Sequence, residues 1–129
     1  MTPREFDVIV FGSTGFVGRL TAEYLAEHAR PGLKWAIAGR SAEKLESLRD
    51  DLAQLDPSLA ELATIEADSL DLPAMRALAE RTKVIATTVG PYAKYGEPLV
   101  KACADAGTDY LDLCGEPAWM RQMIDAHEA

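Results

Sequence analysis

The segment from Phe6 to Gly18 constrains the fold of this chain more than any other. An apolar run, 6–11, ends in three glycines at positions 12, 15 and 18, and a helical pattern of apolar residues follows at once. This succession predicts a buried strand, a tight turn and a helix. In that setting a glycine-rich turn is typical of dinucleotide-binding domains, because the N-terminus of the helix then faces the pyrophosphate.

Each glycine has its own expected role. Gly12 would allow a sharp turn at the end of the strand, Gly15 would leave the backbone open to the pyrophosphate, and Gly18 would let the helix lie close to the sheet. The free N–H groups of the first helical turn would then face the phosphates. The candidate cofactor-binding residues of this turn are Gly12, Ser13, Thr14, Gly15, Phe16, Val17 and Gly18.

The spacing of the glycines leaves one alternative open. It is Gly-x-x-Gly-x-x-Gly and not the more common Gly-x-Gly-x-x-Gly, so the turn could instead serve only the close packing of helix and sheet. A phosphate-binding loop of the NTPase type is excluded, because that motif ends in Gly-Lys-Ser/Thr and here Arg19 and Leu20 follow Gly18. The strand before the turn and the helix after it favour nucleotide binding.

Short apolar runs alternate with amphipathic helical patterns along the whole chain. Strands are expected at 6–11, 34–38, 63–66, 84–88 and 110–113, and helices at 15–28, 41–55, 72–81, 97–106 and from 117 onward. Five strand–helix steps with short links predict an α/β Rossmann fold, a doubly wound parallel sheet in the order 3-2-1-4-5. We expect residues 1–129 to form one domain, the N-terminal part of a longer enzyme, because the last helical pattern has no stop signal.

The bulk properties of the chain exclude several classes of partner. It has 13 basic and 21 acidic residues among 129, a formal net charge of −8, which argues against nucleic acid or an anionic membrane surface. No apolar run approaches the roughly 20 residues of a membrane span, and the polar N-terminus is no signal peptide. Cys103 and Cys114 lack metal-ligand spacing, so we expect reduced thiols in a cytoplasmic protein and no metal site.

The end of the second expected strand indicates which dinucleotide binds. An NAD-binding domain usually carries an Asp or Glu there, which accepts a hydrogen bond from the ribose 2′-OH. This chain instead has Arg40 followed by Ser41. A guanidinium forms charge-assisted hydrogen bonds to a 2′-phosphate, so NADP(H) is predicted in preference to NAD(H). The alternative is that Arg40 is a solvated surface charge.

Other strand ends supply further candidates. Asp68 is expected either to bond the adenine edge or to be an ordinary turn residue, and Glu116 to be a substrate-side carboxylate or a first-turn helix acid. Tyr92 and Tyr95 would reach the nicotinamide end or be half-buried loop aromatics. No catalytic residue is assigned. The turn expected to pass over the adenosine-side ribose and the phosphates comprises Thr88, Val89, Gly90, Pro91 and Tyr92.

With these residues in place, the chain resembles the N-terminal domain of the saccharopine dehydrogenase-like oxidoreductases, a family that includes bacterial trans-acting enoyl reductases. The similarity rests on four stretches whose order and spacing cover nearly the whole chain. The Gly-Pro-Tyr turn followed by Tyr-x-Asp-x-x-Gly-Glu is the most specific part. The matching stretches are 8–18, 38–41, 88–92 and 109–116.

The resemblance implies NADP(H)-dependent hydride transfer and a further region for the substrate and for dimerisation. It leaves open a small-molecule or a lipid-like substrate, and a homodimer. A non-catalytic NADP(H)-sensing module is the main alternative function. A sugar-nucleotide epimerase is disfavoured, because those enzymes use a Tyr-x-x-x-Lys pair and no tyrosine of this chain has a lysine four residues on.

Overall fold

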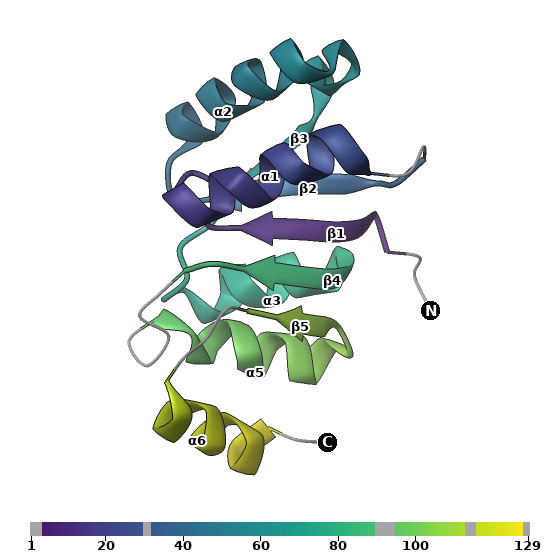
Figure 1. The fold of residues 1–129 in the computed structure, drawn as a ribbon. Helices are drawn as coiled ribbons and strands as arrows, with labels where there is room; N and C mark the ends of the chain where they lie inside the picture. Colours follow the sequence, from purple (N-terminus) through teal and green to yellow (C-terminus); the bar gives the residue numbers. More distant parts are fainter. Residues whose placement is uncertain (1–3, 30–31, 90–94, 113–115, 128–129) are drawn as a thin grey trace.

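The computed structural model describes residues 4–29, 32–89, 95–112 and 116–127. Its centre is a five-stranded sheet in the order β3-β2-β1-β4-β5, in which every neighbouring pair is parallel (Figure 1). The predicted doubly wound order is therefore confirmed. The strands are β1 (Phe6–Phe11), β2 (Trp35–Gly39), β3 (Ala63–Glu66), β4 (Thr82–Thr87) and β5 (Asp109–Leu111).

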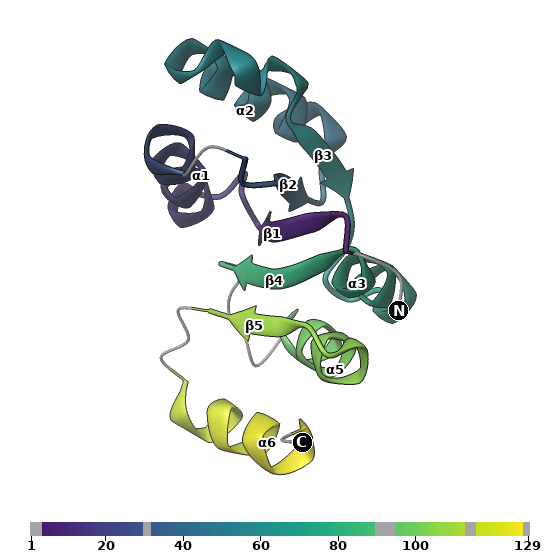
Figure 2. The same cartoon turned by 90° about the vertical axis from the view of Figure 1, so that its right-hand side faces the viewer.

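Helices cover both faces of this sheet. Figure 2 shows α1 (Phe16–His28) and α2 (Ala42–Leu55) on one face, and α3 (Leu72–Glu80) and α5 (Glu97–Ala106) on the other. The last helix, α6 (Pro117–His127), lies beyond the edge strand β5 and contacts α5. Both faces of a parallel sheet are buried in such an arrangement, which explains why the strands read as continuous apolar runs.

Alternate residues of the central strand point into two separate cores. Ile9 and Phe11 pack with residues of α3 and α5, whereas Val10 packs with residues of α1 and α2. All three side chains are at most 1% exposed. This is the period-two alternation of a strand with helices on both sides.

Most boundaries lie where the sequence placed them. Ser41 caps α2, with its Oγ accepting from the Lys44 N–H at 3.3 Å, and Asp71 caps α3 in the same way at 3.2 Å. β2 lies one residue later than expected, β5 covers Asp109–Leu111 where 110–113 was expected, and two further features differ. β4 begins at Thr82 because that residue pairs with Phe6, and a short 3-10 helix, η1 (Pro57–Glu61), follows α2.

Helix α1 packs against the sheet through small residues. Gly18 and Ala22 are buried, while Phe16, Leu20 and Tyr24 are 81%, 50% and 65% exposed. The apolar spacing in the sequence correctly predicted a helix, but its large apolar side chains face solvent. Small residues on the inner face let the helix approach its neighbours closely, and Gly18 contacts the backbone of the turn at Gly12 and Ser13.

Candidate cofactor-binding site

The glycine turn between β1 and α1 fits tightly against the end of β4. Gly12 has a φ of 83°, a left-handed conformation that L side chains rarely adopt. A Cβ atom on this residue would lie 2.8 Å from Val89 Cγ2 and 2.9 Å from Thr88 Oγ1. The sharp turn expected at Gly12 is thus present, and it leaves no room for a side chain.

The other two glycines differ from one another. A Cβ on Gly18 would overlap the Gly12 carbonyl oxygen and lie 2.8 Å from Ser13 Cα, so α1 contacts the backbone of the turn at this point. A Cβ on Gly15 would meet only the Gly12 carbonyl oxygen, at 3.5 Å, an ordinary contact. Gly18 is therefore needed for packing, whereas Gly15 keeps open a space that the fold itself does not fill.

Hydrogen bonds to both neighbouring strands fix the turn. The Ala38 carbonyl oxygen of β2 accepts from Gly12 N at 2.9 Å, Ser13 N at 3.3 Å and Ser13 Oγ at 3.1 Å. On the other side, Thr88 Oγ1 donates to the Gly12 carbonyl oxygen at 3.3 Å. The buried Ser13 hydroxyl thus holds the turn in place, and its backbone is anchored before any ligand arrives.

The N-terminus of α1 is open to an anion. Gly15 is its N-cap residue and supplies no side-chain hydrogen bond, and the first turn contains no acidic residue. Ser41 and Asp71, in contrast, cap α2 and α3. The first N–H groups of a helix have no intrahelical acceptor, so this end offers donors and the positive end of the helix dipole to a phosphate.

A cavity of about 380 Å³ lies in front of the turn, at the carboxyl ends of the strands. We call it the main cavity. It brings together segments that are far apart in the sequence: the glycine turn, the end of β2, the start of α2 and the end of β4. It is lined by Phe11, Gly12, Thr14, Gly15, Gly39, Arg40, Ser41, Lys44, Ser69, Thr88 and Val89.

Seven of the predicted cofactor-binding residues line the main cavity, and five other described ones do not. Ser13 and Gly18 are buried in the turn, and the side chains of Phe16 and Val17 are exposed. Asp68 lines a neighbouring cavity, and its Oδ1 accepts from the Leu70 N–H at 2.9 Å, as in an ordinary turn. The remaining predicted residues, Gly90, Pro91 and Tyr92, lie outside the described part of the chain.

Two further candidates, Glu116 and Tyr95, lie away from the main cavity. Glu116 directly precedes α6, and its carbonyl oxygen accepts from the Met120 N–H at 3.0 Å. Tyr95 is half-buried. Neither residue lines the main cavity. The structure therefore gathers the candidates around the glycine turn and β2, and leaves these two apart from them.

The sequence alone did not reveal Lys44 or Ser69. Lys44 stands three residues after the cap Ser41, on the first turn of α2, and Ser69 follows β3 and is 4% exposed. The signal for Lys44 was available, because a residue at the third helical position lies beside the cap. The prediction from the end of the second strand included only Arg40 and Ser41.

The charge of the main cavity suits a phosphorylated ligand. Within the described residues no carboxylate forms an ion pair with Arg40 or Lys44, whereas Arg19, Arg81 and Lys83 each do with an acidic neighbour. Arg40 and Lys44 thus place two cations beside the main cavity in a chain of net charge −8. Together with the open helix terminus and the gap beside Gly15, they fit the pyrophosphate and 2′-phosphate of NADP(H).

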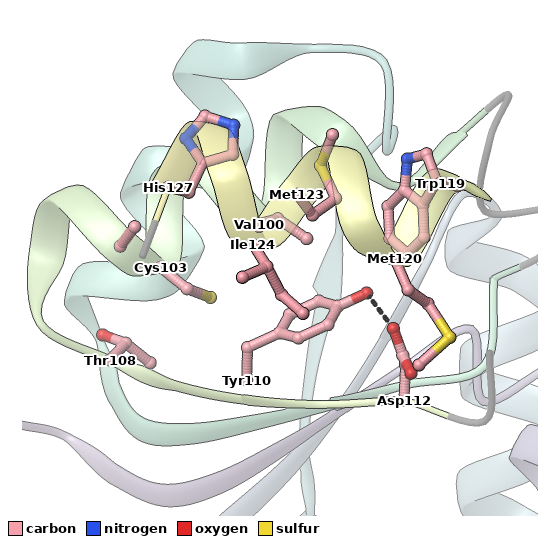
Figure 3. A pocket seen from close by; sticks show the side chains of 11 residues that line it. Val100, Cys103, Thr108, Tyr110, Asp112, Trp119, Met120, Met123, Ile124 and His127 are labelled. Carbon is pink, nitrogen blue, oxygen red and sulfur yellow. Dashed lines mark hydrogen bonds between the residues drawn. The ribbon is translucent and has the colours of Figure 1, made fainter. Parts of the chain in front are cut away.

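A second cavity of about 380 Å³ lies beside the edge strand β5, between β5, α5 and α6 (Figure 3). Its walls are mainly apolar, with Trp119 and Met123 of α6 facing Tyr110 of β5, whose hydroxyl donates to Asp112 Oδ2 at 2.6 Å. His127 lines it too, with a side chain only 16% exposed, so it is less exposed than a surface helix residue. Among the described residues no lysine or arginine lines this cavity, so they offer no cation to the phosphates of a dinucleotide.

The described residues contain neither a candidate membrane span nor a candidate metal site. None of their helices is long and apolar enough to cross a membrane. No three His, Cys, Asp or Glu side chains among them gather in a way that would hold a metal ion.

A family model of the saccharopine dehydrogenase NADP-binding domain matches residues 8–129. The chain belongs to this family. It is thus an NADP-binding domain of a saccharopine dehydrogenase-like oxidoreductase family, and the predictions of the family and of NADP(H) as cofactor are confirmed.

Similar proteins agree with this assignment. A trans-acting enoyl reductase of Mycobacterium tuberculosis is 48% identical over 124 residues, which cover 96% of this chain and 29% of that protein. The chain thus spans about 29% of the length of the curated relatives that it matches. A saccharopine dehydrogenase (L-Glu forming) from Saccharomyces cerevisiae superimposes with a TM-score of 0.72 at 19% identity, over 92% of this chain and 24% of that chain. This last likeness shows the fold alone.

Proposed function

We propose that this domain positions NADPH in a longer, cytoplasmic reductase that acts on an activated carbon–carbon double bond. The family supplies the cofactor, and the names of relatives that are 48% identical supply the reaction class, enoyl reduction. When bound, NADPH provides the hydride for such a reaction. The substrate would be held by chain beyond the described domain, as would any contacts that form a homodimer.

One observation carries the proposal for the site. A single cavity combines the glycine turn, which offers free N–H groups and a gap at Gly15, with Arg40 and Ser41 at the end of β2. The first element suits a pyrophosphate and the second suits a 2′-phosphate. The distance between them is set by the parallel pairing of β1 with β2, which brings the two strand ends to the same edge.

The described residues would bind and orient the cofactor. The N–H groups at the start of α1 donate to the pyrophosphate, and the Arg40 guanidinium donates to the 2′-phosphate. Thr88 and Val89, fixed against Gly12, close the side of the cavity at β4. The roles of Asp68 at the adenine edge and of Gly90, Pro91 and Tyr92 over the ribose and phosphates stay predictions.

Calorimetric titration with NADPH and NADH at equal ionic strength tests the proposal. The unaltered chain should bind NADPH more tightly than NADH. Arg40→Ala should weaken NADPH by about 10- to 150-fold, which corresponds to about 1.5–3 kcal/mol for a charge-assisted hydrogen bond, and should change NADH little. Gly15→Val should abolish binding of both without unfolding the chain, because a Cβ there meets only one atom, at an ordinary distance.

Two results would contradict the proposal. An equal loss of NADPH and NADH in Arg40→Ala would remove the 2′-phosphate role of this residue. Unchanged affinity in Gly15→Val would mean that the glycine turn serves only packing. NADPH oxidation by the longer protein with an enoyl substrate then tests the reaction class, and a full-length protein that binds NADPH but turns over none would favour a sensing module.

A further inference from the structure

Lys44 lies between the main cavity and a smaller cavity of about 160 Å³. We infer that Lys44 is a second phosphate-binding cation, which together with Arg40 encloses the 2′-phosphate and sets the preference for NADP(H). This inference rests on the proposed function, because it needs the cofactor in the main cavity. Neither the strand-tip pattern of the sequence nor the family assignment names this residue.

Each of the two cations also lines a second cavity, and these second cavities differ. Arg40 also borders a cavity on the β3 side, together with Glu66, Asp68 and Asp71. Lys44 instead borders the smaller cavity, together with Thr14 and Ser47. Ser41 lies between them in sequence and lines the main cavity with both. A group bound in front of Ser41 would therefore lie in a cavity that is lined by both the guanidinium and the ammonium.

The acidic residues decide on which side of Arg40 a phosphate lies. The β3 side carries three carboxylates, those of Glu66, Asp68 and Asp71, which repel an anion and suit the amino group of an adenine. On the Lys44 side, the described residues that line the smaller cavity include three hydroxyl residues, Arg19 and Leu48, but no carboxylate. A phosphate bound by Arg40 is thus directed toward Lys44.

Lys44 is available for this contact, unlike the other cation of the smaller cavity. Arg19 is bound to Glu23 at 3.0 Å and to Asp51 at 2.8 Å, and these hydrogen bonds raise its pKa. Within the described residues Lys44 has no such partner. The Ser41 hydroxyl completes the arrangement, since it accepts from the Lys44 N–H and keeps its own proton to donate to a phosphate oxygen.

The test compares Lys44→Gln with Lys34→Gln in the calorimetric titration. Glutamine keeps the length and helix propensity of lysine and removes its charge. Lys34 is a matched control, because it too is exposed and has no ion pair among the described residues, but it precedes β2 at the far end of the strand from Arg40. We expect Lys44→Gln to raise the Kd for NADPH about 5- to 20-fold and the Kd for NADH less than about twofold. Lys34→Gln should change neither.

The outcomes separate this inference from the proposed function. If Arg40→Ala loses the preference for NADPH while Lys44→Gln keeps it, the inference is wrong and the proposed function stands. The inference also fails if Lys44→Gln weakens NADPH and NADH equally, or no more than Lys34→Gln does. If the unaltered chain binds neither cofactor, both fail. Added salt should weaken NADPH binding less in Lys44→Gln than in the unaltered chain, because one charge contact is gone.

Discussion

Gly18→Ala should destabilise the chain severely, although it adds one methyl group to a helix. The new Cβ would overlap the Gly12 carbonyl oxygen and lie 2.7 Å from the Gly12 carbonyl carbon. Both are backbone atoms of a turn that hydrogen bonds to Ala38 and Thr88 hold in place, so neither can move away cheaply. Overpacking of this kind costs about 1–3 kcal/mol, and the rigidity of the turn places Gly18 at the upper end of that range.

The expected loss of unfolding free energy in Gly18→Ala converts into a shift of the melting temperature. An unfolding entropy of roughly 2.1 cal/mol/K per residue gives about 0.27 kcal/mol/K for 129 residues. A loss of about 3 kcal/mol therefore lowers the Tm by about 11 °C. Circular dichroism or scanning calorimetry without cofactor measures this shift directly, and agreement between the two methods checks that unfolding is two-state.

Two other glycines serve as controls, because each isolates a different cost. Gly107 at the end of α5 has a φ of 71° but open space around it, so Gly107→Ala adds only backbone strain, about 1–2 kcal/mol. Gly15→Ala adds neither strain nor a clash and loses about 1 kcal/mol or less at the N-cap, but it should weaken NADPH binding. A Gly18→Ala chain that melts at or above the temperature of Gly107→Ala would refute the reasoning.

Two further predictions concern titratable groups. Burial, with a smaller contribution from Asp109, raises the pKa of the Cys103 thiol to about 12. Iodoacetamide at pH 8 should therefore leave Cys103 unmodified in the folded chain and alkylate it after denaturation. Peptide mapping by mass spectrometry checks this, and rapid modification of Cys103 in the folded chain would contradict its burial. The hydrogen bond from Arg81 lowers the pKa of the exposed Glu5 carboxyl, so the stabilising effect of this pair is present above the ordinary carboxyl pKa and is lost as the pH falls through the lowered value. Glu5→Gln should therefore melt with a weaker dependence on pH in the acid range than the unaltered chain, and an unchanged dependence would show that the pair contributes nothing.

The sequence predicted those parts of the fold that local chemistry determines. β1, β3 and α5 have the predicted bounds, because apolar runs, capping residues and glycines mark them clearly. The N-cap residues Ser41 and Asp71 were likewise predicted, since a short polar side chain directly before a helical pattern typically caps the helix. The 3-10 helix η1 was missed, although the Asp56 carboxylate that caps it precedes a proline in a typical helix-start pattern.

The remaining features depend on contacts between distant segments, which no local pattern encodes. The clash that makes Gly18 necessary arises from how closely α1 approaches the turn, and the outward position of Phe16 and Leu20 follows from the same approach. The access of Lys44 to the cavity depends on where α2 begins relative to the glycine turn. Sequence reasoning thus predicted the turn and the strand tip that line the main cavity, but not that Lys44 on the first turn of α2 lines it too.

The position of β1 in the middle of the sheet has a consequence for synthesis of the chain on the ribosome. One edge of β1 pairs with β2, which follows it closely in the sequence. The other edge of β1 pairs with β4, which is synthesised much later and whose Thr82 pairs with Phe6. Until β4 emerges, the nascent chain presents an apolar strand with an open edge, the kind of surface that chaperones cover. Of the partners of the glycine turn, Ala38 lies in the earlier strand β2, whereas Thr88 follows β4 and emerges later. The main cavity, which Thr88 and Val89 help to line, is therefore complete only after β4 has joined the sheet.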